Sequence, residues 1–233
     1  THAGFSSYPH AAWFGWDSFM ALCDKNKTQN GICYPHEEPV ERLLKHPVLF
    51  IEGHDWMDEV TQSKLVEYVE RGGVLVMTSR VPHLDDRFKP CTILRDKLFA
   101  CDVKTLAAEE SFGYAFEGDR FKGTSRGPVQ TFSGFGGGVS PVASATVHGK
   151  NVTCGTITNY GTGKAVHLGF SPWQTELGEW GSVGLIEFIA REFAKVSLTA
   201  AVVPHPVDPL VEAAEFRCDA KGRRYVYVLT RKN

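Results

Sequence analysis

The sequence predicts a three-layer α/β domain with a mostly parallel sheet, followed by a C-terminal β-hairpin. Two continuous apolar runs, residues 47–52 and 73–78, have the composition of strands that are buried on both faces. A helical segment, residues 57–71, lies between them and ends at a Gly-Gly pair. A strand, a helix and a second strand with short connections form a βαβ unit, so the two strands should be parallel. Helices must then cover both faces of the sheet.

The N-terminal half carries two further helical patterns. Aromatic and apolar residues recur at helical spacing over residues 10–26, and a short helix over residues 39–46 leads into the first strand. In the helix 57–71, the side chains expected to face the sheet are Val60, Leu65, Tyr68 and Val69.

Polar residues and a glycine predict the two ends of the helix 57–71. Asp55 is the expected N-cap, with Asp58 and Glu59 in the first turn, where carboxylates interact favourably with the helix dipole. Gly72 can take the left-handed conformation that often ends a helix.

The second half of the chain mixes clear and weak signals. Residues 90–106 predict an amphipathic helix and a short strand, whereas residues 107–140 suggest loops and edge strands. Two strands flank the turn 159–163, and the second of them, 164–169, should join the parallel sheet. A long helix is predicted over residues 181–195.

The C-terminal residues predict a linker and the start of another unit. Prolines at 204, 206 and 209 mark the linker, so the main domain should cover residues 1–203 and a small β-domain should begin within 204–233. The hairpin expected over residues 211–231 has little core of its own and is marginal alone. We expect it to lean on the main body, or to pair through its edge with a neighbouring chain.

Composition excludes several classes of protein. The formal net charge is −2 with no basic run, which argues against nucleic acid, and the longest apolar runs, about seven residues, are too short for a membrane span. Six cysteines without a Cys-x-x-Cys pair do not suggest a zinc ribbon, and no cofactor is predicted. The chain begins with Thr1 and shows no signal-peptide pattern, as in a fragment or a processed chain, and its compartment is undetermined.

Two loops should meet at the carboxyl edge of the sheet. His54 and Asp55 follow the first strand, and Arg80 and His83 follow the second. Ligands commonly bind at this edge of an α/β sheet, so the four side chains are candidates for binding a small polar ligand. The alternative is a solvated loop whose charges pair with one another. The acidic and histidine residues of the first loop also allow a metal site, although capping of the following helix explains the carboxylates equally well (Glu52, His54, Asp55, Asp58, Glu59).

Glycine-rich and aromatic segments offer further candidates. The glycines of residues 133–141 precede Val-Ser-Pro instead of a helix start, which favours a flexible loop over a nucleotide-binding loop. Trp173 and Trp180 lie in a loop and could stack on sugar rings, whereas Trp13 and Trp16, at helical spacing, favour a core role. Trp173 is therefore a candidate ligand-binding residue.

Four segments carry a resemblance to a known family. They are HPVLFIEGHDWMDEVTQSKLVEYVERGGVLVMTSR (46–80), LRDKLFACDVK (94–104), NYGTGKAVHLGFSP (159–172) and EFRCDAKGRRYVYVLTRKN (215–233). The first three resemble the class I glutamine-amidotransferase-like second domain of family 42 β-galactosidases, and the last resembles the start of their small β-domain. The resemblance implies a flavodoxin-like fold. It also implies a non-catalytic accessory domain of a larger glycoside hydrolase polypeptide, with roles in trimer formation and in supporting the rim of the active site.

The same resemblance can be tested at the nucleophile position. True amidotransferases carry a Cys in a Gly-x-Cys-x-Gly turn, a strained turn with no room for large side chains beside the nucleophile. Here the matching position is Thr78, followed by Ser79 and Arg80, so that turn cannot form in the same shape. His167 lies within a strand, and no Cys-His pair is present. Two alternatives remain: a stand-alone hydrolase or amidotransferase-like enzyme using Ser79 or a cysteine with His54 or His83, and a carbohydrate-binding module that uses Trp173.

Overall fold

The computed structural model describes residues 33–107, 111–172 and 184–197, together with the backbone of residues 211–218 and 223–230. The helices are α2 Val40–Leu43, α3 Glu59–Glu70, α4 Ile93–Leu98, η2 Glu117–Asp119, α5 Leu185–Ile189 and η3 Ala190–Ala194. The strands are β1 Val48–Glu52, β2 Val74–Thr78, β3 Asp102–Leu106, β4 Phe112–Phe116, β5 Lys122–Ser125, β6 Val129–Ser133, β7 Val139–Val147, β8 Lys150–Tyr160, β9 Gly163–Leu168, β10 Val211–Cys218 and β11 Arg223–Thr230.

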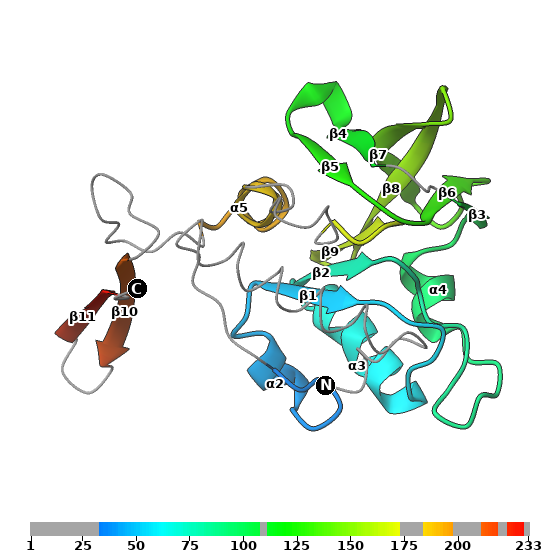
Figure 1. Cartoon of the computed structure of the whole chain (residues 1–233). Coiled ribbons are helices and arrows are strands. Elements are labelled where there is room, and N and C mark those ends of the chain that lie inside the picture. Colours follow the sequence, from blue (N-terminus) through cyan, green and yellow to red (C-terminus); the bar gives the residue numbers. More distant parts are fainter. Residues whose placement is uncertain (1–32, 108–110, 173–183, 198–210, 219–222, 231–233) are drawn as a thin grey trace.

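The main sheet is mixed and curled, so the predicted flavodoxin-like fold with a mostly parallel sheet is wrong. Its order is β1-β2-β9-β8-β7-β4-β5. Only β1, β2 and β9 run parallel to one another, and every later pair in the order is antiparallel. The seven strands bend into a half-barrel, which Figure 1 shows as the sheet turns from β1 towards β4.

The antiparallel half of the sheet could not be predicted from the sequence because its strands lack a clear pattern of apolar residues. Strand β7 reads VSPVASATV, in which small and polar residues replace the branched apolar residues that usually mark a strand. Pro141 and Ala143 flank a register shift, which is where a proline can be accommodated within a sheet. Hairpins between neighbouring strands then extend the sheet without crossover helices.

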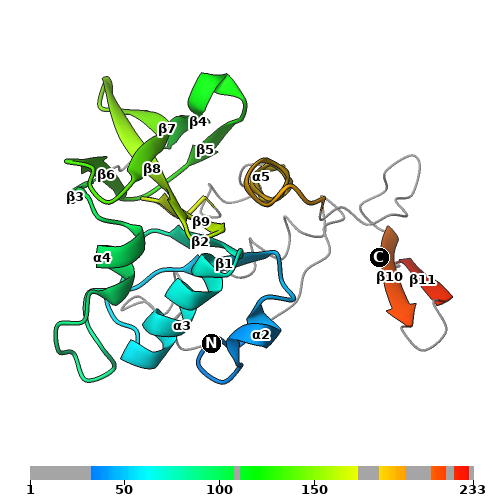
Figure 2. The same ribbon diagram turned by 180° about the vertical axis from the view of Figure 1, so that it is seen from behind.

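The predicted βαβ unit is confirmed. Strand β1 pairs with β2, and β2 with β9, in parallel along five residues each. Helix α3 covers one face of these strands through a core that includes Leu65, Tyr68 and Leu75. Helix α5 lies over the opposite core cluster, and Figures 1 and 2 show the two helices on opposite sides of the sheet.

Helix α3 begins later than the cap assignment predicted. Asp58, rather than Asp55, is the N-cap, and its carboxylate accepts a hydrogen bond of 2.7 Å from the Thr61 N–H. This start sets which residues face the sheet. Val60, predicted to be inward, exposes 62% of its surface, whereas Gln62 is fully buried. The predicted left-handed Gly72 is confirmed, with φ 111°.

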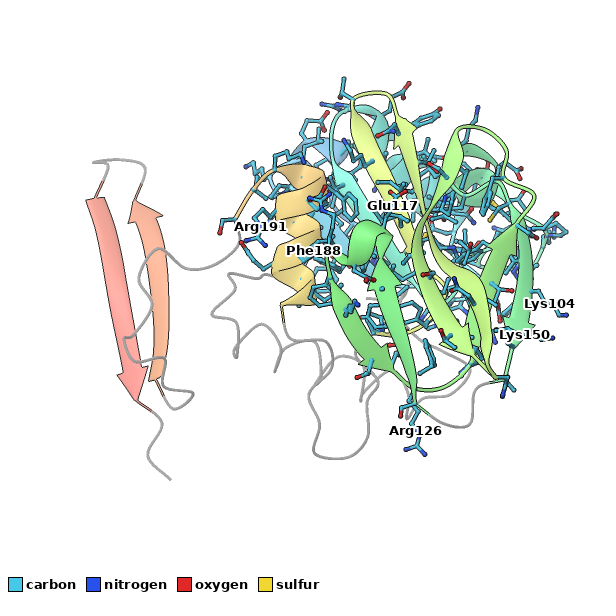
Figure 3. All side chains as sticks on the ribbon, turned by 90° about the horizontal axis from the view of Figure 1, so that it is seen from above. Lys104, Glu117, Arg126, Lys150, Phe188 and Arg191 are labelled. Carbon is cyan, nitrogen blue, oxygen red and sulfur yellow. The ribbon has the colours of Figure 1, made fainter. Side chains whose placement is uncertain are left out.

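The C-terminal helix is shorter and less regular than predicted. Helix α5 continues into the π-helical turn η3, while residues 181–183 of the predicted helix lie outside the described chain. Phe188 packs against the rings of Phe116 and Phe121, with centroids 5.0 and 5.2 Å away. Figure 3 shows Phe188 on the sheet side of α5 and Arg191 on the other side. An ion pair between Arg120 and Glu192 ties the helix to the turn η2.

Three smaller features complete the fold. The predicted hairpin at 159–163 joins β8 to β9 around Gly161, at φ 57°. Strands β3 and β6 form a separate two-stranded sheet, as do β10 and β11, the predicted C-terminal hairpin. The predicted helix 10–26 lies outside the described residues, and the domain boundary near residue 203 stays a prediction.

Candidate functional site

The three parallel strands end at one edge of the sheet, where the Glu52 carboxylate accepts hydrogen bonds from hydroxyl groups at the strand ends. Glu52 closes β1 and accepts hydrogen bonds from Ser79 Oγ at 2.6 Å and from Thr78 Oγ1 at 2.8 Å. Ser171, which follows β9, donates to the same carboxylate at 3.3 Å. Each donor stabilises the charged carboxylate, so this network ties together the ends of three strands.

Ser79 adopts a backbone conformation that the sequence did not reveal. Its φ is 64°, and the Arg80 N–H donates to the Thr78 carbonyl at 2.8 Å, which closes a three-residue γ-turn. Positive φ is uncommon for a residue with a side chain and stores backbone strain. Gly53 permits the turn, because a Cβ atom there would lie 1.6 Å from the Arg80 carbonyl oxygen. The glycine-flanked nucleophile turn is absent, as predicted, but a different strained turn takes its place.

The histidine on the neighbouring strand β9 is poorly suited to act as a base for this turn. His167, on β9, is 1% exposed and packs against the rings of Phe99 and Phe132. Among the described residues, neither ring nitrogen has a hydrogen-bond partner. Burial lowers the pKa of His167 to about 3. The polar backbone of Ser79 favours the charged ring and raises this pKa, but it offsets only part of the effect of burial. The Ser79 hydroxyl donates its hydrogen bond to the Glu52 carboxylate and not to an imidazole.

The two predicted loops do lie side by side. Trp56 forms a parallel bridge with Leu84, and the His83 and Leu84 N–H groups both donate to the Asp55 carbonyl, at 2.9 and 3.0 Å. Arg80 Nη1 pairs with Asp55 Oδ2 at 2.5 Å. Of the predicted ligand-binding residues, Asp55, Arg80 and His83 thus meet at one surface.

The other two predicted ligand-binding residues have different positions. His54 is buried, with 6% exposed, and so does not present its ring at this surface. Trp173 lies outside the described residues.

Neither a metal site nor a membrane span is found in the part of the chain that the structure describes. No three or more His, Cys, Asp or Glu side chains there lie close enough together to hold a metal ion. None of the helices in that part has the length and the apolar character needed to span a membrane.

A tight turn extends from the second loop and carries an aromatic side chain that the sequence analysis missed. The Asp85 carboxylate accepts the N–H groups of Arg87 and Lys89, both at 2.8 Å, and the Asp85 N–H donates to the Lys89 carbonyl. These bonds, led by that from Lys89, keep the pKa of Asp85 below its usual value. At the tip, Phe88 has φ 58°, exposes 69% of its surface and meets Trp56 edge-on, with centroids 6.3 Å apart.

A buried glutamine holds both loops against helix α3. The Gln62 amide nitrogen donates to the carbonyls of Met57 (2.8 Å), Leu84 (3.4 Å) and Cys91 (3.3 Å), and its oxygen accepts from the Leu94 N–H. Sequence periodicity could not identify this residue, because a polar side chain at an inward helical position is expected to point to solvent.

We expect Gln62→Leu to lower the free energy of unfolding by about 2–3 kcal/mol, because buried backbone groups lose their partners. Urea denaturation would measure the loss. Ser63→Ala, at an exposed position of the same helix, serves as the control and should change stability by about 0.5 kcal/mol or less. Equal stability of the two variants would contradict the role of Gln62 in anchoring the loops.

Comparison with known proteins relates this chain to glycoside hydrolases. Residues 36–125 match the model of the family described as GLMA-like, second domain. An exo-β-D-glucosaminidase of Pyrococcus horikoshii is 33% identical over 131 residues, which is 56% of this chain and 16% of that protein. A second exo-β-D-glucosaminidase, from Thermococcus kodakarensis, is 37% identical over 59 residues, 25% of this chain and 8% of that protein.

Solved structures show the same fold within larger enzymes. A β-galactosidase from Bacillus circulans sp. alkalophilus superimposes with a TM-score of 0.71 at 16% identity, over 96% of this chain and 32% of the enzyme. A β-galactosidase from the haloarchaeon Halorubrum lacusprofundi gives a TM-score of 0.63 at 15% identity, over 94% of this chain and 30% of the enzyme. The chain thus corresponds to one part of these much longer polypeptides.

Proposed function

We propose that this chain is a non-catalytic accessory domain of a larger glycoside hydrolase that acts on amino sugars or galactosides. The observation that carries the proposal is the hydrogen bond from Ser79 Oγ to Glu52. An activated serine is usually oriented by an imidazole base, whereas the Ser79 hydroxyl is held by a carboxylate that it shares with Thr78 and Ser171. The relatives support the proposal that this chain is part of a larger enzyme, because each is a long glycoside hydrolase of which this chain matches only a part.

The cysteines that the structure describes offer no better nucleophile. Burial raises the pKa of the thiols of Cys33, Cys91 and Cys101, and that of Cys154 to about 12. A thiol is reactive only as its thiolate, so these groups stay protonated and inert near neutral pH. This supports an accessory role over the alternative of a cysteine-dependent enzyme.

The proposal also covers the rest of the polypeptide and its assembly. We place the end of the domain near residue 203 and assign the hairpin β10–β11 to the beginning of a further small β-domain. Contacts with the remainder of the longer chain, and with other copies of it, would then be the domain's main contribution.

We expect the 233-residue chain to hydrolyse β-glucosaminides, β-galactosides, glutamine and activated esters no faster than buffer. The reason is that the Ser79 hydroxyl is held by the shared Glu52 carboxylate and not by an imidazole, so Ser79→Ala should give the same baseline. Chromogenic glycoside and ester assays and a glutaminase assay would measure this. Turnover that disappears in Ser79→Ala would contradict the proposal and favour the alternative of a serine hydrolase.

A further inference from the structure

Phe88 has an unfavourable conformation without any compensating burial. A bulky side chain at φ 58° is a genuine outlier, and the left-handed region costs about 1–2 kcal/mol for a residue with a Cβ atom. Burial of the ring would offset that cost, but Phe88 leaves 69% of its surface in contact with water. Among the residues that the structure describes, its ring contact is the edge-on one with Trp56. Its display is therefore not explained by the stability of the fold.

The turn that carries Phe88 is held firmly. Asp85 makes hydrogen bonds across the turn with three of its groups. Its carboxylate accepts from the Arg87 and Lys89 N–H groups, its N–H donates to the Lys89 carbonyl, and its carbonyl accepts from the Phe88 N–H at 3.1 Å. The bridge between Leu84 and Pro90 closes the base of the turn, and Gln62 fixes Leu84 to helix α3. The backbone that carries Phe88 is thus fixed and has little conformational entropy to lose on binding.

Polar groups lie next to this aromatic pair. Trp56 is bridged to Leu84, and Asp55 and His83 come directly before them in the two loops, joined by the hydrogen bond from the His83 N–H to the Asp55 carbonyl. Asp55 is already paired with Arg80, so the two charges largely cancel. The surface therefore combines two aromatic rings with hydrogen-bonding side chains of low net charge.

We propose that Trp56, Phe88, Asp55, Arg80 and His83 form a saccharide-binding surface at the carboxyl edge of the sheet. A sugar ring presents an apolar face of C–H groups that can lie against an aromatic ring, and a rim of hydroxyl groups that bond to paired polar side chains. An ammonium group on the sugar would add a cation–π contact with the rings.

The composition of the turn favours a sugar over a protein partner. Besides Phe88, its exposed side chains are Asp86, Arg87 and Lys89, all of them charged. The centre of a protein interface is depleted of charged residues and needs a wider apolar area than two rings. A self-paired Asp55–Arg80 couple also suits the hydroxyl groups of a sugar better than an anionic ligand.

Titration of the ¹⁵N-labelled chain tests this surface, with β-1,4-linked glucosamine oligomers and lactose as separate probes. Only this choice of sugars rests on the proposed function. We expect the indole N–H signal of Trp56 to shift with a dissociation constant of about 1 mM. Phe88→Ser should weaken binding about tenfold or more, and Phe88→Tyr should preserve it. The control Val60→Ser changes a similarly exposed apolar residue, and should leave binding unchanged.

Phe88→Gly separates binding from folding. Glycine accepts positive φ without strain, so this variant should be at least as thermally stable as the parent chain and yet lose the sugar-induced shifts. The proposal is overturned if neither sugar shifts the Trp56 signal at about 20 mM, or if Phe88→Ser binds as well as the parent chain. It is also overturned if Phe88→Ser changes only self-association measured by sedimentation, since the surface would then contact protein. None of these outcomes affects the accessory role, which the turnover assays test separately.

Discussion

The free energy of unfolding is expected to fall by about 2 kcal/mol between about pH 7.5 and pH 5 through His167 alone. In the folded chain, burial lowers the pKa of His167 from 6.5 to about 3. As the pH falls, His167 therefore becomes protonated near pH 6.5 in the unfolded chain but stays neutral at that pH in the folded chain. The stabilisation is fully present above pH 6.5 and is lost as the pH falls towards 3.

The surroundings of His167 explain why the effect should be large. The ring is 1% exposed, and the aromatic rings of Phe99 and Phe132 pack against it at 5.5 and 4.7 Å. A charged imidazolium there would lack both water and a counter-ion among these contacts. Each unit of difference in pKa between the folded and unfolded states corresponds to about 1.4 kcal/mol.

His167→Leu isolates this contribution. The substitution removes the titrating group and two ring nitrogens that have no hydrogen-bond partner among the described residues. We expect its free energy of unfolding, measured in urea between about pH 5 and pH 7.5, to depend on pH by about 2 kcal/mol less than that of the parent chain. His83→Gln is the control, because His83 is exposed. Parallel pH profiles of the parent chain and His167→Leu would show that His167 does not control acid stability.

The sequence predicted the parallel part of the fold well, because continuous apolar strands and a helix of clear period leave few alternatives. It failed for the antiparallel half, whose strands have weak patterns and where the pairing of β4 with β7 joins segments distant in the sequence. Strand β7, with its serines, alanines and Pro141, is the clearest case. The position of the N-cap, Asp58 and not Asp55, was also missed, because several acidic residues precede the helix.

The candidate site was predicted in part for the same reason. The carboxyl ends of neighbouring parallel strands must meet, which brought Asp55, Arg80 and His83 together. The conformations of Ser79 and Phe88 could not be foreseen, because neither residue type predicts positive φ. The turn at Ser79 depends on a partner distant in the chain, Gly53, whereas that at Phe88 depends on the bonds that Asp85 makes within the turn.

Gly53→Ala is expected to lower the free energy of unfolding by about 3 kcal/mol or more. The added Cβ would lie 1.6 Å from the carbonyl oxygen of Arg80 and 2.9 Å from that of Thr78. Both obstacles are backbone atoms, so no side chain can rotate out of the way. The strand end must move, which breaks the 2.8 Å hydrogen bond from the Gly53 N–H to the Thr78 carbonyl.

The same movement should open the γ-turn at Ser79 and separate its hydroxyl from Glu52, so the damage reaches beyond one steric contact. Gly113→Ala is the matched control, because a Cβ atom on Gly113 would meet no atom within 4 Å. Its free energy of unfolding, measured in urea beside that of Gly53→Ala, should stay within about 0.5 kcal/mol of the parent chain. Equal stability of Gly53→Ala and Gly113→Ala would contradict this account, because it would mean that the ends of β1 and β2 are not packed closely enough to exclude a Cβ atom at Gly53.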